Sequence, residues 1–481
     1  MKQWISTGIL ILSTLIPLFP GGKAPTPTPL DPFMDSIRGN PFLLRQFLTE
    51  LPKGAELHIH TSGALYAERI IQLGIQRNLY ISGESFQLYK EPEAQTGLVS
   101  LRAAAQDSSF YEAIVRGWSM FNFKPLKQSA NDHFFGVFGK FRPALTESDP
   151  ALILSAIRTQ AARDNILYIE PNTGVRSFNE QIRKVVASIT VQESLATRAG
   201  ILKFHKKLSQ HPDFQNATAG AAARLEELKR DSDRMSAGSP GGNVDMRFLY
   251  GTIRVTPLKS VLAQLITAFS VASRSPLVVG VNIMGPENHP TSRKDYSAHM
   301  KMIGILGELY PAVKQSLHAG ELVMGQSDPA DLRFHIREAV TVAGAERIGH
   351  GTAIAYEDSG LDTLALMSSR GIAVEIPLTS NELLLGVKGK HHPLPTYLHH
   401  NVPIVICTDD PGIFRTDMTN EYVMAVTRYP QISYSILKQI SRNSIQYSFL
   451  EKKAGKRLLE KLEQAFEEFE RRWMEYSRRA G

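Results

Sequence analysis

The chain has 481 residues, 43% of them hydrophobic and 21% charged, with 54 Lys and Arg against 47 Asp and Glu and a formal net charge of +7. This ordinary globular composition excludes a disordered or fibrous chain. It leaves material for one barrel of about 250 residues with additions, or for two domains. The positive charge forms no long basic block and is most simply a solvated surface, so we expect no nucleic-acid partner.

The first 24 residues have the features of a secretory signal peptide. Lys2 precedes an apolar run over residues 5–19, and small residues lead up to Ala24. The run is short for a transmembrane helix, so we predict a signal peptide over residues 1–24, a secreted or periplasmic protein, and no stable membrane association after cleavage. An uncleaved anchor is the alternative, because Pro25 is an awkward residue after a cleavage site. Cys407 is the only cysteine, which excludes an intrachain disulfide and favours a bacterial periplasm.

Residues 25–45 begin Pro-rich and are predicted to be a linker and lead-in to a barrel domain over residues 46–481. In that domain, apolar strand-like runs alternate with helical patterns, which is typical of a parallel α/β architecture. Eight strands with ligand-type residues at their carboxyl ends favour a (β/α)8 TIM-type barrel over an open sheet. The predicted strands cover residues 54–60, 166–171, 247–255, 277–284, 316–319, 347–349, 372–376 and 404–408.

Segments outside the eight repeats predict extra helices at the N-terminus, within the chain and at the C-terminus. Helical patterns cover residues 41–51, 182–208 and 421–479, and they dominate residues 67–145. The aromatic residues of that last segment are predicted to be mostly core. Residues 213–244 are polar and end in the loop signal SAGSPGGN, so we predict a surface insertion on the barrel there.

Three short stretches carry residues of the types that bind metals. LHIH contains His58 and His60, LHAGE contains His318, and CTDDP contains Asp409. Side chains alternate along a strand, so His58 and His60 point the same way. Two imidazoles on one face, a third from another strand and a carboxylate make a first shell for a borderline divalent metal such as Zn²⁺. Each stretch alone is a weak signal, but their joint occurrence at strand ends predicts a metal site.

The sequences HIHTSGA, HAGE, RIGHGTAI, IPLTSN and TDDPGIF, in this order, resemble the adenosine deaminase family, including its secreted, growth-factor-like branch. The resemblance spans about residues 51–449, with a poorly matched middle third. It implies that His58, His60, His318 and Asp409 hold one catalytic Zn²⁺ per chain, with water completing the shell.

The resemblance also assigns roles to four further residues. Glu321 matches the acid that protonates the purine ring nitrogen, and a dry pocket would keep it protonated by raising its pKa. His350 matches the base that takes or steers the proton of water. Asp410 matches the residue that binds the imidazole-ring nitrogen, and Gly285 stands where a backbone amide meets the purine. The helices after the first strand are expected to cover the mouth of the site, so a few of their aromatic residues would line the pocket.

One position departs from the family pattern. Cytosolic members usually carry an Asp that binds the ribose 5′-hydroxyl where this chain has Ser62, in Thr61-Ser62-Gly63. A hydroxyl replaces a carboxylate there, which predicts a weaker grip on the 5′-hydroxyl.

Several of these residues have structural alternatives. His350 could be an ordinary loop histidine, and Asp409 with Asp410 could form a turn before Pro411. Glu170 and Glu375 interrupt apolar strands: facing inward they could orient metal-bound imidazoles, and facing outward they would be surface charges.

The function expected from the resemblance is zinc-dependent deamination of adenosine, 2′-deoxyadenosine or a related 6-aminopurine nucleoside to an inosine-type product and ammonia. One alternative is deamination of adenine, an adenine nucleotide or a modified aminopurine. Another is a secreted signalling or binding protein that keeps the barrel without catalysis, but the complete set of ligands, acid and base argues against it. A cytidine-deaminase type of zinc site is excluded because it needs at least two cysteines. The oligomeric state is left open.

Overall fold

The computed structural model describes residues 25–125, 128–146, 149–174 and 176–480. The predicted signal peptide over residues 1–24 lies outside this part of the chain. Within it, no helix is both long enough and apolar enough to cross a bilayer.

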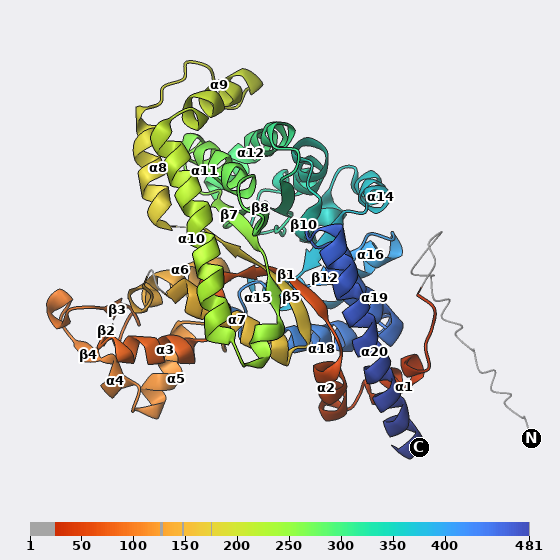
Figure 1. Cartoon of the computed structure of the whole chain (residues 1–481). Coiled ribbons are helices and arrows are strands. Elements are labelled where there is room, and N and C mark those ends of the chain that lie inside the picture. The colour runs from red at the N-terminus through yellow and green to blue at the C-terminus, as the bar shows by residue number, and fades with distance from the viewer. Residues whose placement is uncertain (1–24, 126–127, 147–148, 175, 481) are drawn as a thin grey trace, which may run out of the picture.

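Eight parallel strands form the centre of the molecule (Figure 1), as the sequence predicts. Neighbouring strands pair in chain order, and the apolar runs that predicted them are buried on both faces, as parallel strands between helices must be. The short β6 (Asp245–Met246) adds to β5 outside this order. The eight strands are β1 (Gly54–His60), β5 (Ile166–Thr173), β7 (Phe248–Ile253), β8 (Val278–Met284), β9 (Lys314–Ala319), β10 (Arg347–His350), β11 (Ala373–Ile376) and β12 (Ile404–Ile406).

The barrel closes between β1 and the residues after β12 through an isolated bridge and a side chain. The bridge joins Ile59 and Asp409, and the backbone N–H groups of Asp409 and His60 donate to the carbonyls of His58 and Asp409 (2.9 Å each). The buried carboxylate of Glu56 accepts from the backbone N–H of His58 (3.0 Å) and of Thr408 (3.1 Å), and from the Thr408 hydroxyl (2.7 Å). Glu56 therefore satisfies N–H groups that a regular ladder would have paired. This irregular seam is where Asp409 enters the site.

Helices surround the strands and fill the connections between them. The 25-residue α10 crosses the outside of the barrel against α7 and α8 (Figure 1) and occupies most of the segment predicted as a surface insertion. Its SAGSPGGN end forms a turn and a short 3₁₀ helix over Pro240–Asn243. The helices that follow barrel strands or cover them are α7 (Asp149–Arg163), α8 (Arg176–Ser188), α9 (Arg198–Ser209), α10 (Pro212–Ser236), α11 (Leu258–Ala272), α12 (Pro290–Leu309), α13 (His335–Glu338), α14 (Gly360–Arg370), α15 (Leu378–Leu385), α16 (Leu394–His399) and α17 (Pro411–Phe414).

The two ends of the described chain pack together below the barrel. The N-terminal helices α1 (Leu30–Ile37) and α2 (Pro41–Glu50) meet the helical tail of α18 (Met418–Arg428), α19 (Tyr434–Gln446) and α20 (Lys452–Ala480). The ring of Phe47 contacts Phe469 and Trp473 edge-on, with centroids 4.9 and 5.0 Å away. This aromatic cluster joins α2 and α20, which lie in segments predicted to be helical. The helix α1 is not predicted, since its residues fall in the segment expected to be a linker and lead-in.

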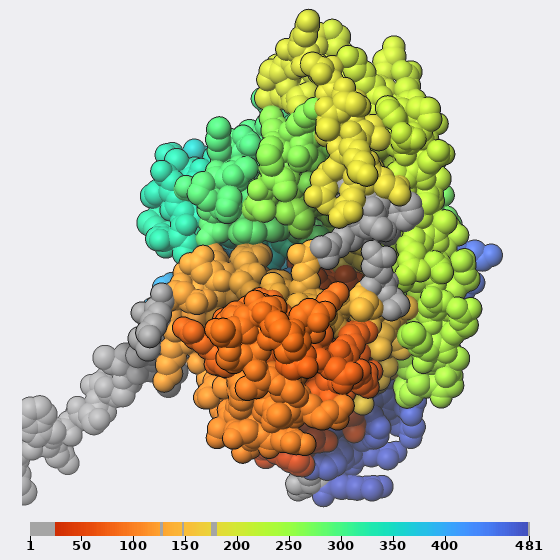
Figure 2. All heavy atoms as spheres, turned by 90° about the vertical axis from the view of Figure 1, so that its left-hand side faces the viewer, coloured from red at the N-terminus to blue at the C-terminus, as the bar shows by residue number. Residues whose placement is uncertain are grey.

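The segment after β1 differs from its prediction. It contains the helices α3 (Ala67–Gln76), α4 (Leu101–Ala104), α5 (Ser108–Gly117) and α6 (Ala130–Phe141), but also an antiparallel sheet of β2 (Tyr80–Ser82), β3 (Leu88–Tyr89) and β4 (Leu98–Ser100). These strands have two or three residues each, too few to show a period of two in the sequence. Figure 2 shows the segment, in orange, as a lobe on one face of the molecule. The single helix predicted over residues 182–208 is likewise two helices, α8 and α9, separated by residues 189–197.

Candidate metal centre and active site

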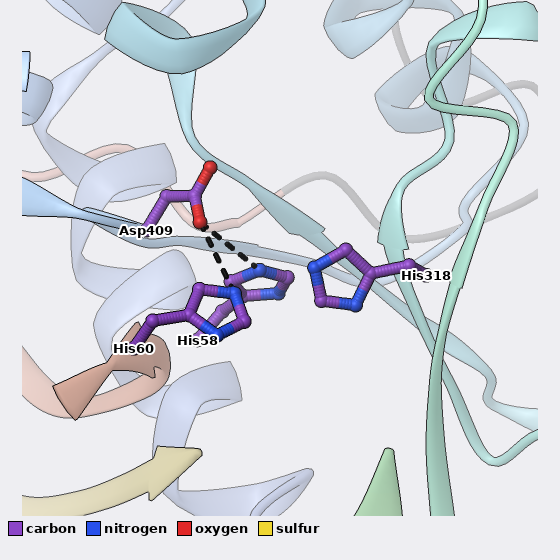
Figure 3. Close-up of side chains that lie close together, drawn as sticks. All are labelled: His58, His60, His318 and Asp409. Carbon is purple, nitrogen blue, oxygen red and sulfur yellow. Dashed lines mark ion pairs between the residues drawn. The ribbon is translucent and has the colours of Figure 1, made fainter. Parts of the chain in front are cut away.

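The four predicted metal ligands converge at the carboxyl ends of the barrel strands. His58 and His60 come from β1, His318 from β9, and Asp409 from the residues after β12. One ligand atom from each lies within 4.8 Å of all the others, and all four residues are buried. The Asp409 carboxylate is 3.6 Å from His58 Nε2 and 3.3 Å from His60 Nε2, and the three rings face one point (Figure 3).

A buried ionic network orients His58. The Glu375 carboxylate lies 2.7 Å from His58 Nδ1, and its other oxygen accepts from Arg347 Nε (2.6 Å) and from the Ser316 hydroxyl (2.7 Å). Arg347 also pairs with Glu170 at 2.7 Å. Both glutamates therefore face the barrel interior, which answers the alternative left open by the sequence. Glu375 contacts the imidazole, whereas Glu170 acts on it only through Arg347.

The remaining ligands are fixed in similar ways. Asn282 Oδ1 lies 2.9 Å from His318 Nδ1, and Arg254 donates to the His318 carbonyl (3.0 Å). Asp409 has a φ of 64°, and its backbone N–H donates to the His58 carbonyl (2.9 Å). A left-handed non-glycine residue is strained, and such strain persists where the surroundings over-determine it, as they do at this seam.

This donor set fits a borderline divalent metal. Nδ1 of His58 and Nδ1 of His318 are engaged by Glu375 and Asn282, which leaves the Nε2 atoms of both rings available to a metal. His58 Nε2 is buried and has no hydrogen-bond partner among the described residues. Three imidazole nitrogens and one carboxylate oxygen suit Zn²⁺ and similar ions. Metal-binding histidines usually have such a partner on the second ring nitrogen.

Glu321 sits beside this centre on a fixed backbone. The buried Glu287 carboxylate accepts from the backbone N–H of Gly320 (2.9 Å) and of Glu321 (3.0 Å), and it contacts His335 Nδ1 at 2.6 Å. Burial, followed by the nearby charges of Asp409 and Glu287, raises the pKa of Glu321 to about 8. A carboxylic acid that keeps its proton near neutral pH can act as a general acid.

The other predicted site residues line the same cavity of about 270 Å³. Its walls include Glu321, His350, Asp410, Gly285 and Ser62. His350 Nε2 lies 3.8 Å from the Glu321 carboxylate, and Gly285 has a φ of +98°, a conformation that favours glycine. Burial and the charge of Asp409 raise the pKa of Asp410.

Two glycines make room for these groups. A Cβ on Gly349 would lie 2.9 Å from the ring of His58, and one on Gly63 would lie 1.8 Å from the Asp410 carboxylate. Real Cβ atoms do not approach other atoms so closely, so a larger residue at either position would displace a site residue.

The opposite wall of the cavity is apolar. Three phenylalanines of α6 line it, as expected for the helices after β1, and aliphatic side chains from the ends of β7, β8 and α15 complete it. Among the described residues the lining contains no Lys or Arg. The apolar residues are Phe134, Phe135, Phe138, Ile253, Val255, Met284, Pro286 and Leu384.

Several residues that support the site were not singled out from the sequence. Asn282 and Arg347 are polar residues inside apolar strands, a signal that could have found them. His335, Asn381 and His392 lie in helices or loops, and their contacts with the site depend on tertiary packing alone.

Comparison with known proteins agrees with this geometry. The family model described as Adenosine deaminase matches residues 227–465 of this chain. That region contains the LHAGE, RIGHGTAI, IPLTSN and TDDPGIF sequences. Over residues 227–465 the chain matches the adenosine deaminase family.

Curated relatives are distant. An aminodeoxyfutalosine deaminase of Streptomyces coelicolor is 32% identical over 147 residues, which cover 30% of this chain and 35% of that protein. An adenosine deaminase of Erwinia tasmaniensis is 27% identical over 320 residues, covering 64% of this chain and 89% of that protein. The chain therefore spans about a third of the first relative and most of the second. Neither match bears on the predicted closeness to the growth-factor-like branch.

Solved structures share the fold. An N6-methyl-AMP deaminase of Arabidopsis thaliana aligns with a TM-score of 0.58 and 18% identity, covering 88% of this chain and 99% of that one. An amidohydrolase from Burkholderia ambifaria, solved with bound Zn, aligns with a TM-score of 0.55 and 18% identity, covering 89% and 94%. At this identity the likeness establishes the (β/α)8 barrel fold alone.

Proposed function

We propose that this protein is a zinc-dependent aminohydrolase that converts adenosine, 2′-deoxyadenosine or a related 6-aminopurine nucleoside into the inosine-type product and ammonia. The observation that carries the proposal is the convergence of His58, His60, His318 and Asp409 within 4.8 Å beside Glu321. One Zn²⁺ per chain bound there would act as a Lewis acid and make water nucleophilic near neutral pH.

The side chains around that centre have complementary tasks. Glu321, with its raised pKa, donates a proton to the purine ring nitrogen beside the carbon under attack. His350 contacts the attacking oxygen atom from the other side of the site. Asp410 binds the imidazole-ring nitrogen, and its buried Oδ1 has no partner among the described residues. The backbone N–H of Gly285 meets the purine at the rim.

The cavity favours a nucleoside over a nucleotide. Its described lining holds no cationic side chain for a phosphate, and the wall opposite the metal ligands is made of phenylalanines and aliphatic residues. Adenine and modified aminopurines are the runner-up substrates, and one relative is named an aminodeoxyfutalosine deaminase.

A binding protein without catalysis is disfavoured by the buried polar atoms that its site keeps without hydrogen-bond partners. His58 Nε2, His350 Nε2 and Asp410 Oδ1 are buried without hydrogen-bond partners among the described residues. Each such atom costs about 1–3 kcal/mol. A barrel kept only for its outer surface would have no reason to maintain them together.

Ammonia release from a panel of substrates tests the proposal. The panel contains adenosine, 2′-deoxyadenosine, adenine, adenylate and an adenosine with an apolar 5′ substituent, each at several concentrations. We expect the highest kcat/KM for one of the nucleosides and the lowest for adenylate. No ammonia from any member by zinc-loaded protein would contradict the proposed function, and a preference for adenylate would contradict the substrate class.

We further propose that the protein is exported, in line with the secreted branch that its HIHTSGA sequence resembles. Lys2 and the apolar run over residues 5–19 support this. Fractionation of the native host with N-terminal sequencing is expected to find a shortened chain outside the cytosol. An intact N-terminus on a cytosolic chain would overturn export.

A further inference from the structure

A line of three buried polar side chains runs from a backbone N–H into the cavity. The N–H of Leu394 donates to His392 Nδ1 (3.0 Å). His392 Nε2 lies 3.0 Å from Asn381 Oδ1, and Asn381 Nδ2 lies 3.0 Å from His350 Nδ1. His392 and Asn381 are both buried, so water does not compete along the line.

The first donor fixes the direction of every hydrogen bond that follows. A backbone N–H can only donate, so His392 Nδ1 accepts and the proton of the neutral ring is on Nε2. That proton is donated to Asn381, whose accepting atom is therefore its oxygen. The amide nitrogen of Asn381 then donates to His350 Nδ1. Since His350 Nδ1 accepts, the proton of the neutral His350 ring is on Nε2.

Burial keeps the His392 ring neutral, because it lowers the pKa of His392 to about 3, with a smaller contribution from the charge of Arg428. The neutral form of His350 follows from geometry, because the Asn381 amide donates to its Nδ1. A second proton on either ring would face a donor, the Leu394 N–H or the Asn381 amide, and would break the line.

The Nε2 end of His350 is the free end of this line. It is buried, it has no hydrogen-bond partner among the described residues, and it lies 3.8 Å from the Glu321 carboxylate. His350 has a φ of 66°, a strained conformation for a residue with a side chain. The next residue is also held, because the Tyr397 hydroxyl donates to the Gly351 carbonyl (2.6 Å).

We propose that Asn381 and His392 are positioning residues that hold His350 as the Nε2–H tautomer, so that His350 donates a hydrogen bond to the attacking oxygen instead of taking its proton. This inference rests on the proposed deaminase function. In its resting state His350 is then a preorganised donor that stabilises negative charge on that oxygen.

The protons balance without a histidine base. Glu321, which starts protonated, delivers its proton to the purine ring nitrogen as the carbon–oxygen bond forms, and the proton lost by water then restores the Glu321 acid. The remaining O–H proton of that oxygen goes to the amino group as the carbon–nitrogen bond breaks and ammonia leaves. One water enters and one ammonia leaves, and His350 keeps its proton throughout.

The test is the tautomer of His350 in the full chain labelled with ¹⁵N-histidine, measured by NMR with and without zinc. The His350 signals are assigned by their loss in His350→Gln. We expect a protonated Nε2 and an unprotonated Nδ1 in the wild type near neutral pH. A wild-type His350 with an unprotonated Nε2 would overturn the proposal whatever the variants do.

Two variants extend the test along the line. Asn381→Asp has the same shape but cannot donate, so the proton should appear on Nδ1 of His350, and kcat should fall by about 10²- to 10³-fold, as for loss of one preorganised donor. His392→Gln keeps a donor toward Asn381 and should keep the Nε2–H tautomer. An Asn381→Asp protein that retains the Nε2–H signal and wild-type turnover would contradict the positioning role.

The spectra also separate this proposal from the proposed function. A wild-type Nε2–H tautomer in a protein that deaminates no aminopurine would overturn the function and leave the positioning network standing. An active deaminase with the His350 proton on Nδ1 would overturn the positioning network and leave the proposed function standing.

Discussion

Two cavities near β1 differ in whether their polar groups have hydrogen-bond partners. The larger, about 430 Å³, lies between α3, α7 and the outer side of β1 and β5. Its polar groups are paired: Glu56 with Thr408, Asp164 with Thr419, and the Tyr66 hydroxyl with a backbone carbonyl. The smaller cavity, about 270 Å³, holds the buried Nε2 atoms of His58 and His350 without hydrogen-bond partners among the described residues.

The difference shows that unpaired buried polar atoms mark the candidate active site better than cavity volume does. An unpaired buried atom costs about 1–3 kcal/mol and persists when a ligand supplies the missing partner. The larger cavity has no such atoms in its described lining.

Asp409→Asn is expected to remove the bound metal and to reduce deamination below detection. It takes the only carboxylate from a four-ligand site, and ligand loss sharply weakens metal binding. Asp164→Asn in the larger cavity is the matched control and should leave metal content and kcat within about twofold of wild type. Elemental analysis and ammonia release measure both. Equal metal content in the two variants would contradict the assignment of the metal site to the smaller cavity.

Glu321→Gln is expected to keep the metal and to lower kcat by roughly 10²- to 10⁴-fold, the usual contribution of a general acid–base group. Glutamine keeps the shape of the side chain and lacks the transferable proton. The measurement is kcat at matched zinc content. Near-normal turnover would show that another group supplies the proton to the ring.

Glu375→Gln is expected to weaken zinc binding by about 10- to 100-fold, because its carboxylate orients His58. Glu170→Gln is the matched control, since Glu170 is equally buried and pairs with the same Arg347 without touching a ligand. Competition with a chromophoric chelator measures both affinities. Equal losses in the two variants would mean that the network acts through the charge of Arg347 and not through the contact with His58.

The smallest effect is expected at Ser62. A neutral hydroxyl contributes about 0.5–1.5 kcal/mol to binding a 5′-hydroxyl, against about 1.5–3 kcal/mol for a carboxylate. The wild type should therefore use adenosine and 5′-deoxyadenosine with kcat/KM values within about tenfold, which is about 1.4 kcal/mol. Ser62→Asp should raise the ratio of kcat/KM for adenosine to kcat/KM for 5′-deoxyadenosine. A hundredfold difference in kcat/KM between the two substrates in the wild type would show that another residue binds this hydroxyl.

The parts of the fold that follow from local patterns could be predicted from the sequence. Buried parallel strands read as apolar runs, so all eight barrel strands were placed within a few residues, and alternation along β1 put His58 and His60 on one face. The two- and three-residue strands β2 to β4 leave no such pattern and were missed.

The supporting groups of the site depend on contacts between distant segments. The sequence could not tell Glu170 from Glu375, because only the three-dimensional arrangement of the barrel decides which carboxylate reaches His58. The line from Leu394 to His350 joins a loop, a helix and a strand end, and none of its members has a period or spacing that marks it. Residue identity predicted the ligands, and packing alone set their partners.

Zinc titration into metal-free protein, with ammonia release from adenosine or the best substrate as the readout, tests whether the four-ligand centre carries the reaction. We expect the stripped protein to be inactive, its activity to rise in proportion to added zinc, and the rise to stop at about one zinc per chain because one four-ligand centre serves the reaction. Full activity in protein shown to contain no metal would contradict this expectation.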